Sequence, residues 1–350
     1  MHRIVLDCER MKYPNTGLFE FGKHLGYSLL DPATRHTNEE IHFYMWPFQK
    51  GFFGRDQHYI TVNLLDKFYM PPHRNIDVWH TCFQGSQYKP TRKETKRVLT
   101  IHDLNFIHEN KPPHKIRKYL KRLQQTINES DHIATISHFV MADVKKHLQL
   151  DHKAASVVLN GCELKTFPGF DTPRYRPTQP FLFAIGTVFP KKNFHVLPCL
   201  LRGNEYELII SGIADPAYTA RIIEEARHHG VADRVRITGT VTEEEKYWYY
   251  AHCTAFVFPS LAEGFGFPVV EAMHMGKPVF CSRYTSLPEV GGDIAYYFNS
   301  FDPDDMQATF YKGMEHYHTH QPQQKLKERA HSFSWKETAR QYFDIYRSLY

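Results

Sequence analysis

Two glutamates flank a glycine-rich turn in the second half of the chain. Glu263 and Glu271 lie on either side of Gly264-Phe265-Gly266, shortly after the apolar run 255–259. On one continuous helix the two acids would be about 12 Å apart, because each residue adds 1.5 Å, whereas a turn between them folds both toward one place. Carboxylates accept hydrogen bonds from vicinal hydroxyls, and glycines let backbone N–H groups approach an anion closely. The spacing therefore predicts a site for a diphosphate that carries sugar hydroxyls.

The elements that position these acids are predicted from residue type. Residues 255–259 (Ala-Phe-Val-Phe-Pro) are rich in aromatic and β-branched side chains and are followed by Ser260, which predicts a buried parallel strand. Glu263 then lies in the loop at the carboxyl end of that strand. Pro268 suits the first turn of a helix, because its missing N–H would have no partner there. Glu271 is expected in that first turn, where the positive end of the helix favours a diphosphate.

The complete sequence pattern around the Gly264-Phe265-Gly266 turn helps to distinguish a ligand site from two ordinary solvated acids. Taken as a bare pair, the two acids could equally be solvated residues beside a helix N-terminus, where acids are common. The pattern Pro-Ser-x-x-Glu-Gly-Phe-Gly-x-Pro-x-x-Glu-Ala-Met-x-x-Gly-x-Pro-Val, however, resembles the donor-site signature of the retaining family 4 glycosyltransferases, which are bacterial group 1 enzymes of GT-B fold. This resemblance implies transfer of a hexose, with mannose as the first expectation, to a glycan or lipid-linked acceptor in bacterial surface polysaccharide assembly. The donor would be UDP-, GDP- or ADP-linked, with no cofactor beyond this nucleoside-diphosphate sugar.

The resemblance covers nearly the whole chain. Segments similar to those of the family follow one another in the family's order, at residues 98–103, 134–137, 158–161, 183–193 and 287–293. It implies an α/β fold in which two doubly wound Rossmann-like domains face a cleft. We expect an acceptor-binding domain at 1–165, a donor-binding domain at 166–333, and a crossover helix at 334–350 that packs back onto the first domain.

Hydrophobic patterning independently predicts two sets of parallel βαβ units. Strand-like runs occur at residues 4–6, 43–46, 78–80, 98–101, 132–136 and 157–159, and then at 181–185, 207–211, 235–238, 255–258 and 278–281. Between the two sets, residues 167–180 contain four prolines and little periodicity, which is typical of a connector between domains.

Two lysines are expected to stabilise the leaving group. Charge develops on the departing β-phosphate, so fixed cations aimed there lower the barrier. By resemblance, Lys192 of Pro-Lys-Lys-Asn matches the family's phosphate-binding residue, and Lys191 assists it. In many members of the family a second phosphate-binding arginine follows the glycine that corresponds to Gly186. In this chain Thr187 stands at that position instead. Taken alone, a lysine pair in a loop is usually just exposed.

His102 ends a predicted strand, and the resemblance places its imidazole or backbone carbonyl beside the transferred sugar, although a lone histidine there is more often a packing residue. The segment that contains Gly17 looks like a shortened form of the family's first glycine-rich loop. A single glycine before a helix is also common in an ordinary turn. The expected catalytic residues are thus His102, Lys192 and Glu263. The expected donor-binding residues are Gly17, Gly186, Lys191, Lys192, Glu263, Gly264, Phe265, Gly266 and Glu271.

Composition excludes several other classes of protein. With 42% hydrophobic and 23% charged residues over 350 positions, the chain reads as a globular protein and not as a disordered one. No apolar run approaches the roughly 20 residues that span a bilayer, so a cytoplasmic location is expected. The six cysteines lack any Cys-x-x-Cys spacing, which indicates neither a zinc site nor a disulfide framework. Asp302-Pro303-Asp304-Asp305 is expected to cap a helix, and no metal is assigned.

Charge is unevenly divided along the chain. Residues 1–165 hold 24 Lys and Arg against 17 Asp and Glu, a net +7, which leaves −2 for the remainder. Six basic residues between 111 and 122 are expected on one helix, a pattern suited to an anionic lipid surface at the inner face of the membrane. A solvated helix face is the ordinary alternative. Nucleic acid is not expected as a partner, because no recognition motif accompanies the basic helix.

Three alternatives to transfer stay open at this stage. A GT-B nucleotide-sugar epimerase would release nucleotide and an altered sugar without any acceptor. A phosphorylase would need phosphate or a pyridoxal cofactor. A non-catalytic subunit would bind the nucleotide sugar and regulate a partner without turnover.

Overall fold

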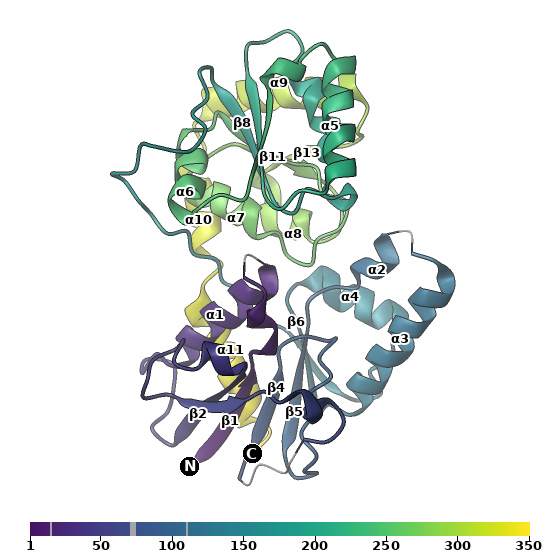
Figure 1. Ribbon diagram of the computed structural model, residues 1–350, viewed down its shortest axis with the longest axis vertical. Helices are drawn as coiled ribbons and strands as arrows, with labels where there is room; N and C mark the ends of the chain where they lie inside the picture. The colour runs from purple at the N-terminus through teal and green to yellow at the C-terminus, as the bar shows by residue number, and fades with distance from the viewer. Residues whose placement is uncertain (15, 71–74, 110) are drawn as a thin grey trace. The chain divides into compact units, whose positions relative to one another are not determined.

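The computed structural model describes residues 1–14, 16–70, 75–109 and 111–350. The chain divides into two compact units, one formed by Met1–Gly161 with Ser334–Tyr350 and the other by Cys162–Phe333. Each unit is an open parallel sheet with helices on its faces (Figure 1). The expected α/β class with two doubly wound Rossmann-like domains is therefore confirmed.

The sheet of the first unit has seven strands in the order β3-β2-β1-β4-β5-β6-β7, and all of its pairings are parallel. Its central strands carry buried apolar side chains because helices cover both faces. The sequence did not predict β3, and the predicted run 157–159 lies three residues too late. The strands are β1 (His2–Asp7), β2 (Glu39–Met45), β3 (His58–Thr61), β4 (Val78–Thr81), β5 (Lys96–Ile101), β6 (His132–Thr135) and β7 (Ala154–Val157).

The last helix, α11 (Trp335–Arg347), belongs to the first unit, as expected. It packs against α1 (Gly17–Leu29), and the two lie side by side in Figure 1. Two of its side chains reach the sheet: the hydroxyl of Tyr346 lies 2.7 Å from Nδ1 of the buried His80, and the ring of Tyr342 packs on the same imidazole. Residues nearly 270 positions apart thus share one core.

The sheet of the second unit has six parallel strands in the order β10-β9-β8-β11-β12-β13. The proline-rich connector belongs to this unit, because the carboxylate of Glu207 accepts from the backbone N–H groups of Thr178 and Gln179 and from the hydroxyl of Tyr175. The strands are β8 (Phe181–Ile185), β9 (Glu207–Ser211), β10 (Val235–Gly239), β11 (Ala255–Phe258), β12 (Val279–Ser282) and β13 (Tyr296–Phe298), of which β13 was not predicted.

The structure confirms the expected cap at Asp302 but places the start of the basic helix later than expected. Asp302 caps α9 (Pro303–His320) through Oδ1, which accepts from the N–H groups of Asp304 and Asp305 at 3.0 and 3.2 Å, so the expected cap is confirmed. The basic helix, α3 (Pro113–Asn128), begins only at Pro113, so Lys111 lies before it, because the two prolines at 112 and 113 start the helix there.

Besides α1 and α11, the α-helices are α2 (Asn105–His108), α3 (Pro113–Asn128), α4 (His138–His147), α5 (Pro216–His228), α6 (Glu243–His252), α7 (Phe267–His274), α8 (Leu287–Gly291), α9 (Pro303–His320) and α10 (Gln323–His331). Within the part of the chain that the structure describes, no helix combines the length and apolarity needed to cross a bilayer.

Candidate functional site

A buried ion pair joins two loops of the second unit. Lys192 ends a short 3-10 helix, Pro190–Lys192, that follows β8, and only 8% of its surface is exposed. Its Nζ lies 2.5 Å from Oε1 of Glu263, in the loop after β11, and 4.9 Å from the ring centroid of Phe258. Because β8 and β11 are adjacent parallel strands, both loops leave the sheet at the same edge. The predicted lysine and one predicted carboxylate therefore meet where α/β sheets bind ligands.

Hydroxyl groups fix the Glu263 loop. Ser260 donates to Oε1 of Glu263 at 2.6 Å, and the backbone N–H of Glu263 donates to the Thr285 hydroxyl at 2.9 Å. Ser286 donates to the carbonyls of Glu263 and Phe265 at 3.0 and 2.8 Å, which braces the glycine-rich turn. The carboxylate is thus held by a cation and a hydroxyl, so its orientation is set in advance of any ligand.

The backbone of Lys191 ties the two loops together. Its carbonyl accepts from the backbone N–H of Leu261 at 2.8 Å and from the hydroxyl of Ser260 at 3.3 Å. The Lys191 side chain is half-buried, whereas that of Lys192 points inward. The neighbouring lysines therefore have different environments, and Lys192 is the one brought to Glu263.

Glycine is required at two positions of the site. Gly186 has φ +150°, and a Cβ there would lie 3.2 Å from Cε of Lys192, so the lysine side chain occupies the space that a larger residue would fill. Gly266 has φ +118°, and a Cβ there would lie 2.8 Å from Cδ2 of Leu287. Both are positions that residues with side chains rarely adopt.

Glu271 lies one turn later than expected. The left-handed backbone of Gly266 stands immediately before α7, which begins at Phe267, so Glu271 is its fifth residue and lies in the second turn. Its Oε1 lies 3.0 Å from Nζ of Lys246, and its Oε2 accepts from the hydroxyl of Tyr250 at 2.8 Å. Burial opposes the charge of Lys246, but the neighbouring carboxylates outweigh it and raise the pKa of the lysine. The two glutamates thus have separate cationic partners.

The remaining candidates, His102 and Gly17, belong to the first unit. His102 follows β5 and is 7% exposed; its Nε2–H donates to the carbonyl of Cys82 at 2.7 Å, and its ring packs edge-on against Phe21. Burial lowers the pKa of His102 to about 4 despite that hydrogen bond, so the imidazole is neutral at pH 7. Gly17 is the exposed first residue of α1, after the cap Thr16. The catalytic and binding roles of both residues stay predictions.

Sequence reasoning missed the residues that support the two acids. Ser260 lies within the quoted signature, but nothing in the sequence shows that its hydroxyl faces Glu263. The capping box Thr242-x-x-Glu245 marks the start of α6, the helix that carries Lys246 and Tyr250, but it does not show that they face Glu271. From that start, residues 246 and 250 are four apart and share one helix face.

Comparison with known proteins identifies relatives of the chain and a family model that matches part of it. Residues 171–332 match the family model for group 1 glycosyl transferases. The chain is 28% identical over 281 residues to O-antigen chain mannosyltransferase B of Escherichia coli, which covers 75% of this chain and 72% of that protein. It is 32% identical over 176 residues to the serotype-specific mannosyltransferase WbdA of Escherichia coli, but this match covers 47% of the chain and only 21% of WbdA.

Solved structures match along the entire chain. Sucrose-phosphate synthase from Thermosynechococcus elongatus aligns with a TM-score of 0.75 at 18% identity, covering 100% of this chain and 99% of that one. HepE of Anabaena, solved with UDP and glucose, aligns with a TM-score of 0.69 at 13% identity, covering 99% and 100%. At such identities the likeness shows the GT-B fold alone. The family model and the curated relatives identify residues 171–332 as a group 1 glycosyl transferase domain, which supports an enzyme of the hexosyltransferase class.

Proposed function

We propose that the chain is a retaining family 4 mannosyltransferase that transfers mannose from a nucleoside-diphosphate donor to a bacterial surface glycan or its lipid-linked precursor. The observation that carries this proposal is the buried Lys192–Glu263 pair at the carboxyl ends of β8 and β11. The names of both curated relatives, each a mannosyltransferase, support the sugar. The name of the first, an O-antigen chain enzyme, supports the acceptor class.

In this proposal the second unit holds the donor. The ammonium of Lys192, assisted by Lys191, and the N–H groups at the start of α7 stabilise negative charge on the β-phosphate as it leaves. Of Glu263 and Glu271, one accepts hydrogen bonds from the ribose and the other from the hexose. Because each carboxylate is already held by its own cation, neither has to be reoriented when the donor binds.

The transfer needs no protein nucleophile. The bond between the anomeric carbon and the phosphate oxygen breaks, the acceptor oxygen bonds to the same face of that carbon, and the leaving phosphate takes the acceptor's proton. This order retains the anomeric configuration. A neutral His102 suits a contact with sugar hydroxyls and does not suit proton donation, because its pKa of about 4 leaves it unprotonated at pH 7.

The test is product analysis with matched donors. The protein is incubated with GDP-, UDP- and ADP-linked hexoses and a mannan oligosaccharide, and the products are separated and assigned by NMR. We expect an elongated glycan with retained configuration, and none with Lys192→Met. Altered sugar formed without acceptor would indicate an epimerase instead, and donor binding without turnover would indicate a non-catalytic subunit.

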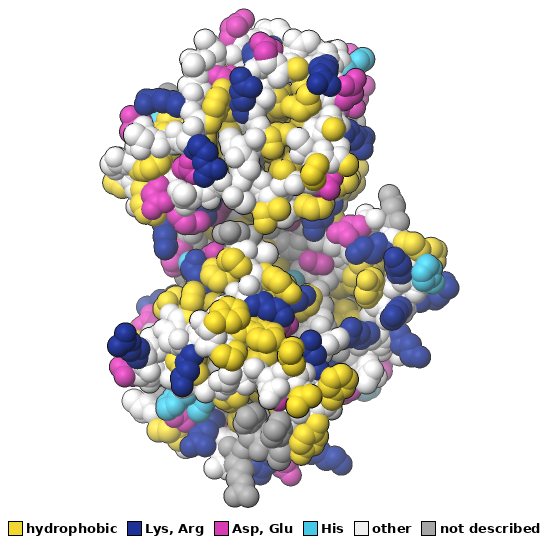
Figure 2. All heavy atoms as spheres, viewed as in Figure 1, with side chains coloured by type: hydrophobic (Ala, Val, Ile, Leu, Met, Phe, Trp, Pro, Cys, Tyr) yellow, Lys and Arg dark blue, Asp and Glu magenta, His cyan; other side chains and the backbone are white. Residues whose placement is uncertain are grey.

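We further propose that α3 rests on an anionic membrane that presents the acceptor. Its basic residues Lys115, Arg117, Lys118, Lys121 and Arg122 are all exposed, whereas Leu123 and Ile127 face the core. Figure 2 shows Lys and Arg side chains gathered over this helix. Each such residue near the surface contributes about 1 kcal/mol of attraction to anionic lipid. Co-sedimentation with anionic vesicles should therefore fall when these residues become glutamine, and equal binding by the variant would contradict the contact.

A further inference from the structure

Four polar side chains lie together on one face of the first unit's sheet. Glu40 and His42 are two residues apart on β2, so their side chains leave the same face. The parallel register pairs Glu40 with Arg3 on β1 and His42 with His58 on β3. Side chains of registered neighbours stand next to each other, so the sheet itself gathers these groups.

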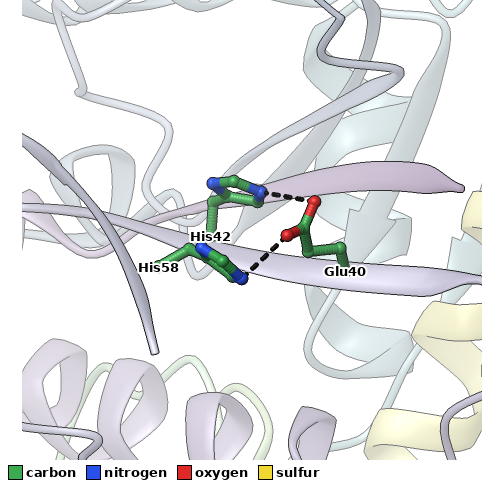
Figure 3. Close-up of side chains that lie close together, drawn as sticks. All are labelled: Glu40, His42 and His58. Atoms are coloured by element: carbon green, nitrogen blue, oxygen red, sulfur yellow. Dashed lines mark ion pairs between the residues drawn. The ribbon is translucent and has the colours of Figure 1, made fainter. Parts of the chain in front are cut away.

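Three of these groups carry metal-ligating atoms that converge. Oε1 of Glu40 lies 2.7 Å from Nε2 of His58, and its Oε2 lies 3.2 Å from Nε2 of His42 (Figure 3). The two imidazole rings are stacked with centroids 4.7 Å apart. One ligand atom from each residue lies within 4.8 Å of the other two. Around a tetrahedral zinc ion with bonds of about 2.0–2.1 Å, ligand atoms are roughly 3.3 Å apart, so small side-chain rotations suffice to enclose an ion.

The buried Nε2 of His42 is poorly satisfied by protein groups. Among the described residues its ion-pair partner is the Glu40 carboxylate at 3.2 Å, which is not well aligned for a hydrogen bond. A metal ion held between the two would satisfy the ring nitrogen.

We propose that Glu40, His42 and His58 form a zinc site that takes a water molecule in the fourth position. Two imidazoles and one carboxylate are ligands that zinc accepts, and three protein ligands leave one position open. Arg3 donates to Oε2 of Glu40 at 3.0 Å and currently supplies the countercharge. Its side chain is 40% exposed, so it can turn into water when the dication replaces it.

The site would fasten the edge of the sheet. β3 is the terminal strand of the order and has only four residues, and neither His58 nor Thr61 is covered. A metal that joins β2 to β3 adds a link that survives fraying of the short strand. The cluster lies in the amino-terminal halves of its strands, at the edge opposite to the one where α/β sheets bind substrates, so it is separate from the proposed donor chemistry.

Zinc titration tests the site directly. The full chain is stripped with EDTA, dialysed and titrated with ZnCl2 by calorimetry, with metal content measured after gel filtration. We expect one zinc per chain and, at a hundredfold excess over the dissociation constant, a rise in Tm of roughly 5 °C. Glu40→Gln and His58→Ala each remove one ligand and should weaken binding more than the 10- to 100-fold that loss of an outer-sphere partner costs.

A matched control separates this site from stray histidine binding. His316 and His320 on α9 also stack, with ring centroids 4.2 Å apart, and the double variant His316→Ala/His320→Ala should bind zinc like the wild type. His58 is exposed at the sheet edge, so His58→Ala should keep the wild-type circular dichroism spectrum. The proposal is overturned if the wild type takes up no zinc, if both ligand variants bind as tightly as the wild type, or if the α9 variant abolishes binding.

Discussion

Replacing Lys192 by methionine separates its chemical role from its structural one. Methionine keeps an unbranched apolar stem but removes the ammonium, so Glu263 keeps Ser260 as its partner and loses its cation. The side chains of the pair are 10% and 14% exposed. Loss of one partner of a buried pair costs about 3–5 kcal/mol of stability, because a charge is left without compensation. In the proposed function Lys192 is a donor to the leaving phosphate, and loss of one such preorganised donor costs about a hundredfold in rate, or roughly 2.7 kcal/mol.

A second variant tells these two effects apart. Lys192→Met/Glu263→Gln also removes the uncompensated charge, so much of the lost stability should return while transfer stays at least a hundredfold slow. The assay is kcat/KM for the donor beside urea unfolding, at one pH and salt concentration. Arg227→Met, which removes an exposed cation from the same unit, is the control and should leave both quantities unchanged. Wild-type rates in folded Lys192→Met, or recovery of rate in the double variant, would refute the role of Lys192 at the phosphate.

Three further predictions follow from local geometry. In the proposed function Glu271 accepts from donor hydroxyls, so Glu271→Gln should raise the donor KM about tenfold or more with a smaller change in kcat, and an unchanged KM would count against that role. Gly186→Ala places a Cβ 3.2 Å from Lys192 Cε at φ +150°, so unfolding by urea should show a loss of about 1–3 kcal/mol, and full stability would show that the loop yields freely. Burial, with Glu9 nearby, raises the pKa of Asp7 to about 7, so the folded state holds a proton that the unfolded state releases above about pH 4. Wild-type stability should therefore fall by roughly 4 kcal/mol from pH 4 to 7 relative to Asp7→Asn, and parallel pH curves for the two proteins would contradict this.

Most of the fold could be predicted because buried parallel strands are continuous apolar runs. The runs at 4–6, 98–101 and 255–258 lie within observed strands for this reason. The strand β3 could not be found this way, since an edge strand of four residues with half-exposed side chains has no apolar run. β13 (Tyr296–Phe298) is shorter still, and its place in the sheet comes from pairing with β12.

The sequence indicated Lys192 and Glu263 as candidate site residues but not the contact between them, which the structure shows. Lys192 and Glu263 are 71 residues apart in the sequence, so their contact cannot be inferred from sequence separation. The contact forms because β8 and β11 are neighbouring strands, and the sequence alone does not give the strand order. Glu271 was placed in the wrong turn because a glycine can either begin a helix or precede it. Its partner Lys246 comes from a helix 25 residues earlier, and no local pattern links the two.

The division of the first unit between residues 1–161 and 334–350 bears on how the protein folds. Residues 162–333 contain the whole second unit, so they can close their own core without α11. Without α11 the amino-terminal sheet lacks Tyr342 and Tyr346, so the imidazole of His80 keeps Thr100 as a partner but loses both tyrosines. A chain truncated after residue 333 should therefore resist protease in the second unit and be susceptible in the first.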